Sequence, residues 1–200
     1  MSNILTSLLS LARDTVRDPK EGARRVLALP LPQRVAWEGL ALVLILSLLL
    51  AYLTTMLLGG SSDPLLPGFA RSPLLTAVIQ AGTLVVMIGA IHGVGRMMGG
   101  SGTLEGAVRL TAWLQFIMLV LQVIQGVFLL VLPAVVGLIG MLSIGLMLWL
   151  LTNFIAVLHG FRSLLAVFLM ILATTFALSL VLVLLLALFG VSPPMEISNV

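Results

Sequence analysis

Residues 110–161 read LTAWLQFIMLVLQVIQGVFLLVLPAVVGLIGMLSIGLMLWLLTNFIAVLHGF and contain no Asp, Glu, Lys or Arg. This run is more than twice the roughly 20 residues that a helix needs to cross a bilayer. Pro133 lies near its middle, where a helix is readily interrupted. The run therefore predicts two membrane-spanning helices joined by a tight turn. Arg162 ends it, and a further uncharged stretch from Ser163 to Met195 supplies another span.

The composition is that of a membrane protein. Hydrophobic residues make up 60% of the 200 residues and charged residues 8%, with a mean hydropathy of +1.25. Soluble domains carry roughly a quarter charged residues. Cysteine is absent, which excludes disulfides, thiol catalysis and cysteine-based metal sites. The net charge of +3 does not indicate nucleic-acid binding, because the basic residues follow the membrane topology.

We expect an all-α polytopic membrane protein, a bundle of five transmembrane helices with a short amphipathic N-terminal arm. The expected spans are residues 35–58, 74–94, 107–131, 134–158 and 164–189. The arm covers residues 1–34, the membrane domain residues 35–190 and a short external tail residues 191–200. A stretch rich in Gly, Pro and Ser, residues 59–73, is expected to join the first two spans.

The arm reads as two short helices. Residues 2–16 have apolar positions at spacings of three and four, and Asp18 followed by Pro19 is typical of a helix start. The basic residues of the arm are candidate membrane-surface contacts: Arg13, Arg17, Lys20, Arg24 and Arg25. We expect this arm to lie on the anionic cytoplasmic face of a bilayer. The alternative is a solvated cap on the helix bundle.

The positions of the basic residues predict the orientation, because Lys and Arg prefer the cytoplasmic side. With five spans, every Lys and Arg except Arg71 falls on one face, together with the N-terminal arm. The N-terminus is therefore expected in the cytoplasm and the C-terminus outside.

The expected span 107–131 carries a polar face, formed by Thr111, Gln115, Gln122 and, further round, Gln125. Amides in hydrocarbon need hydrogen-bond partners, so this face is expected to point into the bundle. One interpretation is interhelical hydrogen bonding that fixes the packing, at about 1 kcal/mol for each bond. The other is a hydrated path or a substrate contact. The packing interpretation is favoured, because amides alone cannot carry protons and no acid lies mid-membrane.

His92 and His159 form a candidate interfacial pair. Each lies near the end of an expected span, with a Gly next and an Arg shortly after. Two histidines that approach one another can bind a metal or respond to pH. A metal site needs three or four ligands, however, and only Glu105 is expected nearby. The favoured interpretation is that these residues mark helix ends, where Arg reaches the headgroups.

Catalytic signatures are absent from the sequence. It contains no HExxH motif, Ser143 lacks the Gly two residues before it that a nucleophile elbow shows, and the segment Gly99-Gly100-Ser101-Gly102 has no lysine after it. We therefore expect no enzyme, no catalytic residue, no metal site and no cofactor.

Several segments occur in an order that resembles the YIP (Ypt-interacting protein) family, over about residues 18–189. They are Asp18-Pro19, residues 97–104 (MMGGSGTL), residues 107–110 (AVRL), residues 156–160 (AVLHG) and residues 161–167 (FRSLLAV). The resemblance implies a cytoplasmic N-terminus and an external C-terminus, in agreement with the charge distribution. The Arg-rich, lysine-poor composition resembles the bacterial branch of the family and implies the bacterial inner membrane.

The chain departs from the eukaryotic members of that family. Trp113-Leu114-Gln115-Phe116 stands where many members have Tyr-Ser-x-x-Pro, and the Asp-Leu-Tyr-Gly-Pro segment is missing. The resemblance therefore does not carry over the eukaryotic role in membrane traffic with Rab-type GTPases.

Two functions are compatible with these features. The first is a non-enzymatic scaffold or adaptor that binds other membrane proteins or organises the bilayer through its arm. The second is a small transporter or channel component that uses the polar face of the third span. The expected partners are the lipid bilayer and other membrane proteins, without nucleic acid, and the oligomeric state is left open.

Overall fold

The structure, a computed structural model, describes residues 2–57 and 72–188. The expected tail at residues 191–200, the cation Arg71 and most of the expected loop at residues 59–73 lie outside these residues.

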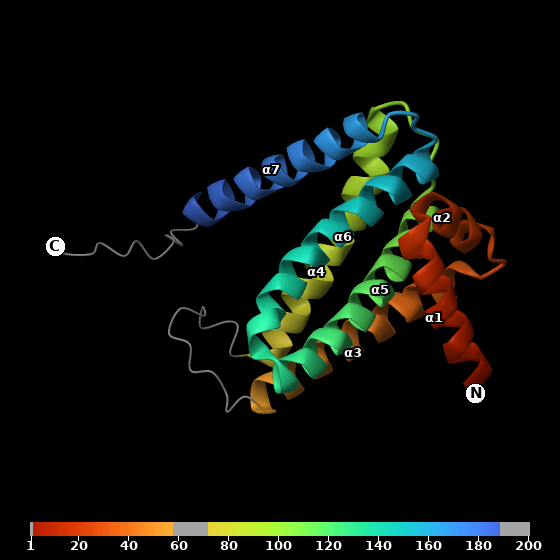
Figure 1. Cartoon of the computed structure of the whole chain (residues 1–200). Coiled ribbons are helices and arrows are strands. Elements are labelled where there is room, and N and C mark those ends of the chain that lie inside the picture. The colour runs from red at the N-terminus through yellow and green to blue at the C-terminus, as the bar shows by residue number, and fades with distance from the viewer. Residues whose placement is uncertain (1, 58–71, 189–200) are drawn as a thin grey trace.

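Seven α-helices form the described part of the chain (Figure 1). They are α1 (Ser2–Arg17), α2 (Pro19–Ala28), α3 (Gln33–Leu57), α4 (Pro73–Met97), α5 (Leu104–Val131), α6 (Pro133–His159) and α7 (Leu164–Leu188). The five from α3 to α7 are long and apolar enough to cross a membrane. The all-α polytopic architecture expected from the sequence, five long apolar helices after a short helical arm, is confirmed.

Local sequence signals set where several helices begin. The Asp18 side chain accepts a hydrogen bond from the N–H of Glu21 at 3.0 Å, and Pro19 occupies the first turn of α2. Thr103 caps α5 in the same way, through the N–H of Gly106 at 3.1 Å. Such side chains satisfy N–H groups that have no partner within the helix. Between α5 and α6 only Leu132 is not helical, so the predicted tight turn at Pro133 is present.

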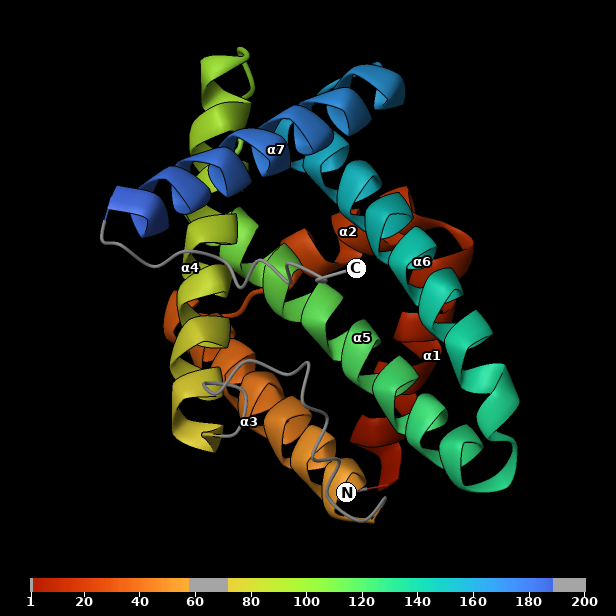
Figure 2. The same ribbon diagram turned by 90° about the vertical axis from the view of Figure 1, so that its left-hand side faces the viewer.

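Helix α5 is the centre of the bundle and packs against α2, α3, α4 and α6 (Figures 1 and 2). We call the end of the bundle where α1 and α2 lie the arm end, and the end where α5 turns into α6 the hairpin end. Helices α4 and α6 finish at the arm end, and α3, α5 and α7 start there (Figure 1).

The buried core lies mainly toward the arm end. Ile88, Leu114, Leu150 and Phe154 are among its most completely buried side chains. Toward the hairpin end many large apolar side chains are exposed, among them Leu49, Leu130 and Met141. Apolar surface of this extent on five long apolar helices is in contact with lipid, so the chain is a multi-pass membrane protein.

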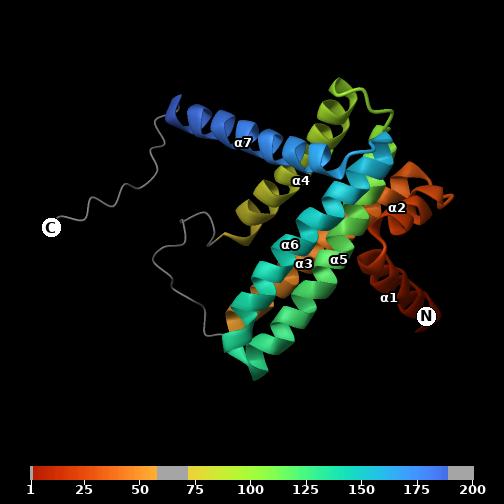
Figure 3. The same cartoon turned by 45° about the horizontal axis from the view of Figure 1, so that its top comes forward.

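Two helices depart from the common direction of the bundle. Helix α7 is buried only near its start, at Val167, Met170 and Ile171, and then diverges from α6 (Figure 2). Helix α1 runs across the direction of α3 and α5 beside the arm end (Figures 1 and 3). The crossing follows from the short turn at Asp18, which joins α1 to a second helix that is docked on the bundle.

Candidate functional site at the arm end

His159, the last residue of α6, binds two other segments through both of its ring nitrogens. The N–H of Gly102 donates to Nδ1 at 3.2 Å, and Nε2 lies 3.0 Å from the carbonyl oxygen of Ile91 in α4. Because Nδ1 accepts, the ring hydrogen lies on Nε2, which donates to Ile91. The imidazole is buried and stacks on Phe161. His159 thus joins the end of α6 to α4 and to the loop before α5.

Three glycines leave the space that this ring fills. A Cβ atom added at Gly95, Gly100 or Gly102 would overlap the imidazole of His159. The same loop also contacts the backbone of α6, because the N–H of Ser101 donates to the carbonyl of His159 at 3.3 Å. We call His159 and these three glycines the histidine clamp.

The candidate pair of histidines lies at the arm end, but the described structure places no hydrogen bond between the two rings. His159 binds the carbonyl of Ile91, the residue before His92. Nδ1 of His92 is buried, and no residue of the described ranges forms a hydrogen bond with it. No group of three or more His, Cys, Asp or Glu side chains that could hold a metal occurs within residues 5–57 and 72–188. Since both nitrogens of His159 already bind backbone groups, the clamp positions helices.

Two members of the polar face of α5 bind neighbouring helices. Gln122 donates from Nε2 to the carbonyl of Ser47 in α3 at 2.9 Å. Gln125 donates from Nε2 to the hydroxyl of Ser143 in α6 at 3.1 Å. These amides therefore tie α5 to the helices on either side of it.

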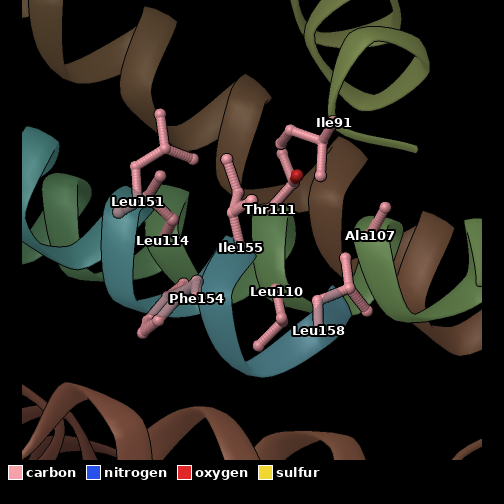
Figure 4. Close-up of a pocket in the computed structure, with 9 residues that line it drawn as sticks. All are labelled: Ile91, Ala107, Leu110, Thr111, Leu114, Leu151, Phe154, Ile155 and Leu158. Carbon is pink, nitrogen blue, oxygen red and sulfur yellow. The ribbon is translucent and has the colours of Figure 1, made fainter. Parts of the chain in front are cut away.

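The other two members of the polar face lie nearer the arm end. Thr111 is buried, and its hydroxyl has no hydrogen-bond partner among the described residues. It lines a cavity of about 10 Å³ between α4, α5 and α6, where it is surrounded by apolar side chains such as Leu114 and Phe154 (Figure 4). A cavity of this size holds about one water molecule. Gln115 is half-buried, and no described residue forms a hydrogen bond with its side chain.

Helix α2 is docked on the ends of α5 and α6. Small residues form most of its buried side, which consists of Pro19, Gly22, Ala23 and Val26. A Cβ atom added at Gly106 of α5 would lie 3.2 Å from the side chain of Leu27. Small residues on both helices let the two backbones approach closely.

Arg109 of α5 binds the chain that leaves α2. Its guanidinium donates to the carbonyls of Leu27 at 3.3 Å, Leu29 at 3.2 Å and Leu31 at 2.7 Å. Carbonyls at a helix C-terminus have no partner within the helix, and a cation there also interacts favourably with the helix dipole. The sequence marks Arg109 as a basic residue that indicates topology and as part of the segment at residues 107–110, but it assigns no contact to the side chain. Its specific role depends on carbonyls about 80 residues away, and no local pattern marks it.

Helix α1 is fixed to α5 through Thr15. Trp113 donates from Nε1 to Oγ1 of Thr15 at 3.2 Å, and the same hydroxyl donates to the carbonyl of Leu11 at 2.8 Å. Gly22 of α2 lies directly against Thr15, where a Cβ atom would overlap the threonine side chain. Thr15 therefore lies at the junction of α1, α2 and α5. We call the docked pair α1 and α2 the arm platform.

Three of the candidate surface cations form ion pairs within the arm platform. Arg13 lies 3.5 Å from Asp14, Arg24 lies 3.5 Å from Glu21, and Arg25 lies 3.2 Å from Glu21. These pairs are exposed and of low strength.

The other two candidate cations, Arg17 and Lys20, form no ion pair with any residue of the described ranges. Arg17 borders a cleft of about 220 Å³ between α1 and α2. Charged side chains form most of the cleft's lining, among them Asp14, Asp18 and Glu21. The platform therefore presents two cations that are available to a partner outside the chain.

A family model described as the Yip1 domain matches residues 13–189 of the chain. The comparison with curated proteins and the comparison with solved structures gave no match.

Proposed function

The chain belongs to the Yip1 domain family, and from this premise we propose that it is a non-enzymatic membrane scaffold or adaptor. In this proposal it binds other membrane proteins, or organises the bilayer around it, through the arm platform. We propose a location in a bacterial inner membrane, with the N-terminus and the arm end in the cytoplasm and the C-terminus outside.

The observation that supports the proposal best is the attachment of the arm to the central spanning helix. Arg109 holds the end of α2 through three carbonyls, and Trp113 holds α1 through Thr15. A segment that served only as a flexible connection would not need side-chain hydrogen bonds to a spanning helix. The attachment supports a surface of defined shape that presents the cations Arg17 and Lys20.

The proposed orientation is supported by the placement of charge. Every Lys and Arg in the described residues lies at the arm end or in the arm platform. They are Arg13, Arg17, Lys20, Arg24, Arg25, Arg34, Arg96, Arg109 and Arg162. Basic residues gathered at one end of a helical bundle favour a cytoplasmic location for that end.

The transporter or channel alternative has narrower support. Thr111 and Gln115 retain unused hydrogen-bonding capacity, as a polar path would need. Gln122 and Gln125, in contrast, are bound to neighbouring helices. The cavity beside Thr111 has a volume of only about 10 Å³. The observations therefore favour the scaffold.

Site-specific crosslinking in native membranes tests the scaffold proposal. A photo-crosslinking residue replaces Arg24, which is exposed on α2, and in a matched control the same residue replaces Leu184, which is exposed on α7. We expect a defined membrane protein to be captured from position 24 and not from position 184. Capture should fall severalfold when Lys20→Glu is added, because this cation of α2 forms no ion pair in the described residues. Capture that is absent, or that is unchanged by the charge reversal, would contradict the proposal.

A further inference from the structure

Helix α1 has an apolar edge that neither the bundle nor α2 covers. Its buried side contains Ala12 and Thr15. Leu5, Leu9 and Val16 are 58%, 42% and 37% exposed. At 3.6 residues per turn these three side chains fall within about 40° of one another, beside the docked side of the helix. We call them the free apolar edge of α1.

The level at which α1 docks coincides with the boundary of the hydrocarbon. Trp113 on α5 and Trp149 on α6 lie about 28 Å and 25 Å from the turn at Leu132, at 1.5 Å per residue. The hydrocarbon core of a bilayer is about 30 Å thick, and tryptophan is enriched at its borders. Trp149 is exposed, as a residue at the lipid interface would be. A membrane with one border near Leu132 therefore has its other border close to the two tryptophans.

Helix α1 lies on the membrane side of α2. Helix α2 and the chain that follows it contact α5 at Gly106 and Arg109. Helix α1 contacts α5 at Trp113, about one turn closer to the hairpin end. Because α1 also runs across the spans (Figures 1 and 3), it lies along the plane of the membrane at this level.

The basic residues of α1 lie beside its free apolar edge, and its acidic residue lies on the opposite side of the helix. On a helical projection Arg13 and Arg17 follow directly after the free apolar edge, on the side that faces away from the docked residues. Asp14 lies on the opposite side of the helix from that edge and is 4.0 Å from Arg25 of α2. Cations therefore border the free apolar edge, and Asp14 faces α2.

We propose that α1 is an interfacial helix, with Leu5, Leu9 and Val16 inserted in the leaflet at the arm end and Arg13 and Arg17 on anionic headgroups. An amphipathic helix of this kind lies in the interface with its apolar face at the boundary between headgroups and acyl chains. The bilayer is the occupant, because the edge is narrow, cationic at its border and at the level of the interfacial tryptophans. The inference rests on one part of the proposed function, the contact of the arm platform with the bilayer. It assigns α1 to the lipid and leaves α2 for a protein partner.

The absence of native cysteine allows a direct test with the full chain. Single cysteines replace Leu9 and, as the matched control, the adjacent exposed Ser10, and each carries an environment-sensitive fluorophore. The purified protein is reconstituted in vesicles of phosphatidylglycerol and phosphatidylcholine. We expect the label at position 9 to be quenched severalfold more by lipids with a nitroxide near the headgroup than the label at position 10. Aqueous iodide should show the reverse order.

Two results would overturn the proposal. One is equal access of iodide to both labels, which means that the edge faces water. The other is protection of position 9 from both quenchers, which means that protein covers it. Arg13→Glu with Arg17→Glu should lower lipid quenching at position 9 in anionic vesicles and leave it unchanged in pure phosphatidylcholine. Unchanged quenching in the anionic vesicles would overturn the role of the arginines.

The quenching experiment contains no partner protein, so its outcome is independent of the crosslinking test. Lipid quenching without partner capture would retain the interfacial helix and reject the adaptor. Partner capture without lipid quenching would retain the adaptor and reject the interfacial helix.

Discussion

The indole Nε1 of Trp113 donates a hydrogen bond of 3.2 Å to the hydroxyl of Thr15, and both residues are buried. Thr15 belongs to the short arm and Trp113 to the central spanning helix. The hydrogen bond therefore fixes α1 to α5 near the arm end.

Replacing Thr15 by Val should loosen α1. The valine leaves the buried indole N–H without an acceptor, at a cost of about 1–3 kcal/mol. We expect faster amide hydrogen exchange in residues 5–17 of the detergent-solubilised protein, with exchange in α5 and α6 unchanged. Ser10→Ala is the control, because Ser10 bonds only within its own helix. Equal exchange in Thr15→Val and wild type would show that the bond does not hold the arm.

Replacing Arg109 by Met should release the end of α2. Three carbonyls lose their donor, and a bond to a charged group contributes about 1.5–3 kcal/mol. We expect a lower midpoint of thermal unfolding and loss of exchange protection around residues 27–31. The control is Arg96→Met, an exposed cation that forms no ion pair in the described part of the chain. A melting temperature as high as that of the control would argue against this role.

Two glycines of α4 should respond oppositely to alanine. Gly95→Ala places a Cβ atom on the imidazole of His159, so the clamp must open or shift. At Gly93 the added Cβ meets nothing within 4 Å, and a helical Gly→Ala change stabilises by up to about 1 kcal/mol. Thermal unfolding should therefore show a lower midpoint for Gly95→Ala and an unchanged or higher one for Gly93→Ala. Similar midpoints for the two variants would mean that the clamp does not stabilise the bundle.

Replacing Gln122 by Leu should affect packing and leave permeability unchanged. The variant loses the hydrogen bond to the Ser47 carbonyl, worth about 1 kcal/mol. We expect a small fall in the thermal midpoint and the same ion leak across proteoliposomes as in the wild type. Gln115→Leu is the comparison, because its amide has no described partner. Solute or ion flux that both replacements abolish would instead support the transporter alternative.

The proposed orientation predicts where a C-terminal reporter is active. Five spans and an N-terminus in the cytoplasm place a fusion after Val200 outside the cytoplasm. A paired set of alkaline phosphatase and green fluorescent protein fusions should give phosphatase activity and no fluorescence. The reverse pattern would invert the topology and remove the charge argument for a cytoplasmic arm.

The sequence alone determined the helical elements and most of their limits. The uncharged run around Pro133 indicated two helices with a tight turn, and Asp18-Pro19 indicated a capped helix start. These features depend on hydrophobic length and on capping within one turn, so they are local properties of the chain. The family was also recognisable from the order of its segments, and the Yip1 domain match confirmed it.

The assembly of the arm end follows from contacts between segments that are distant in the sequence. Two alternatives for the arm were open in the sequence, and the docking through Arg109 and Trp113 is visible only in three dimensions. His159 was considered as one member of an interfacial pair, whereas the fold surrounds it with glycines and backbone groups of α4 and the following loop. These contacts join segments about 57–98 residues apart, and their partners are often backbone atoms. Backbone atoms are the same in every residue, so no sequence pattern identifies which of them a distant side chain will bind.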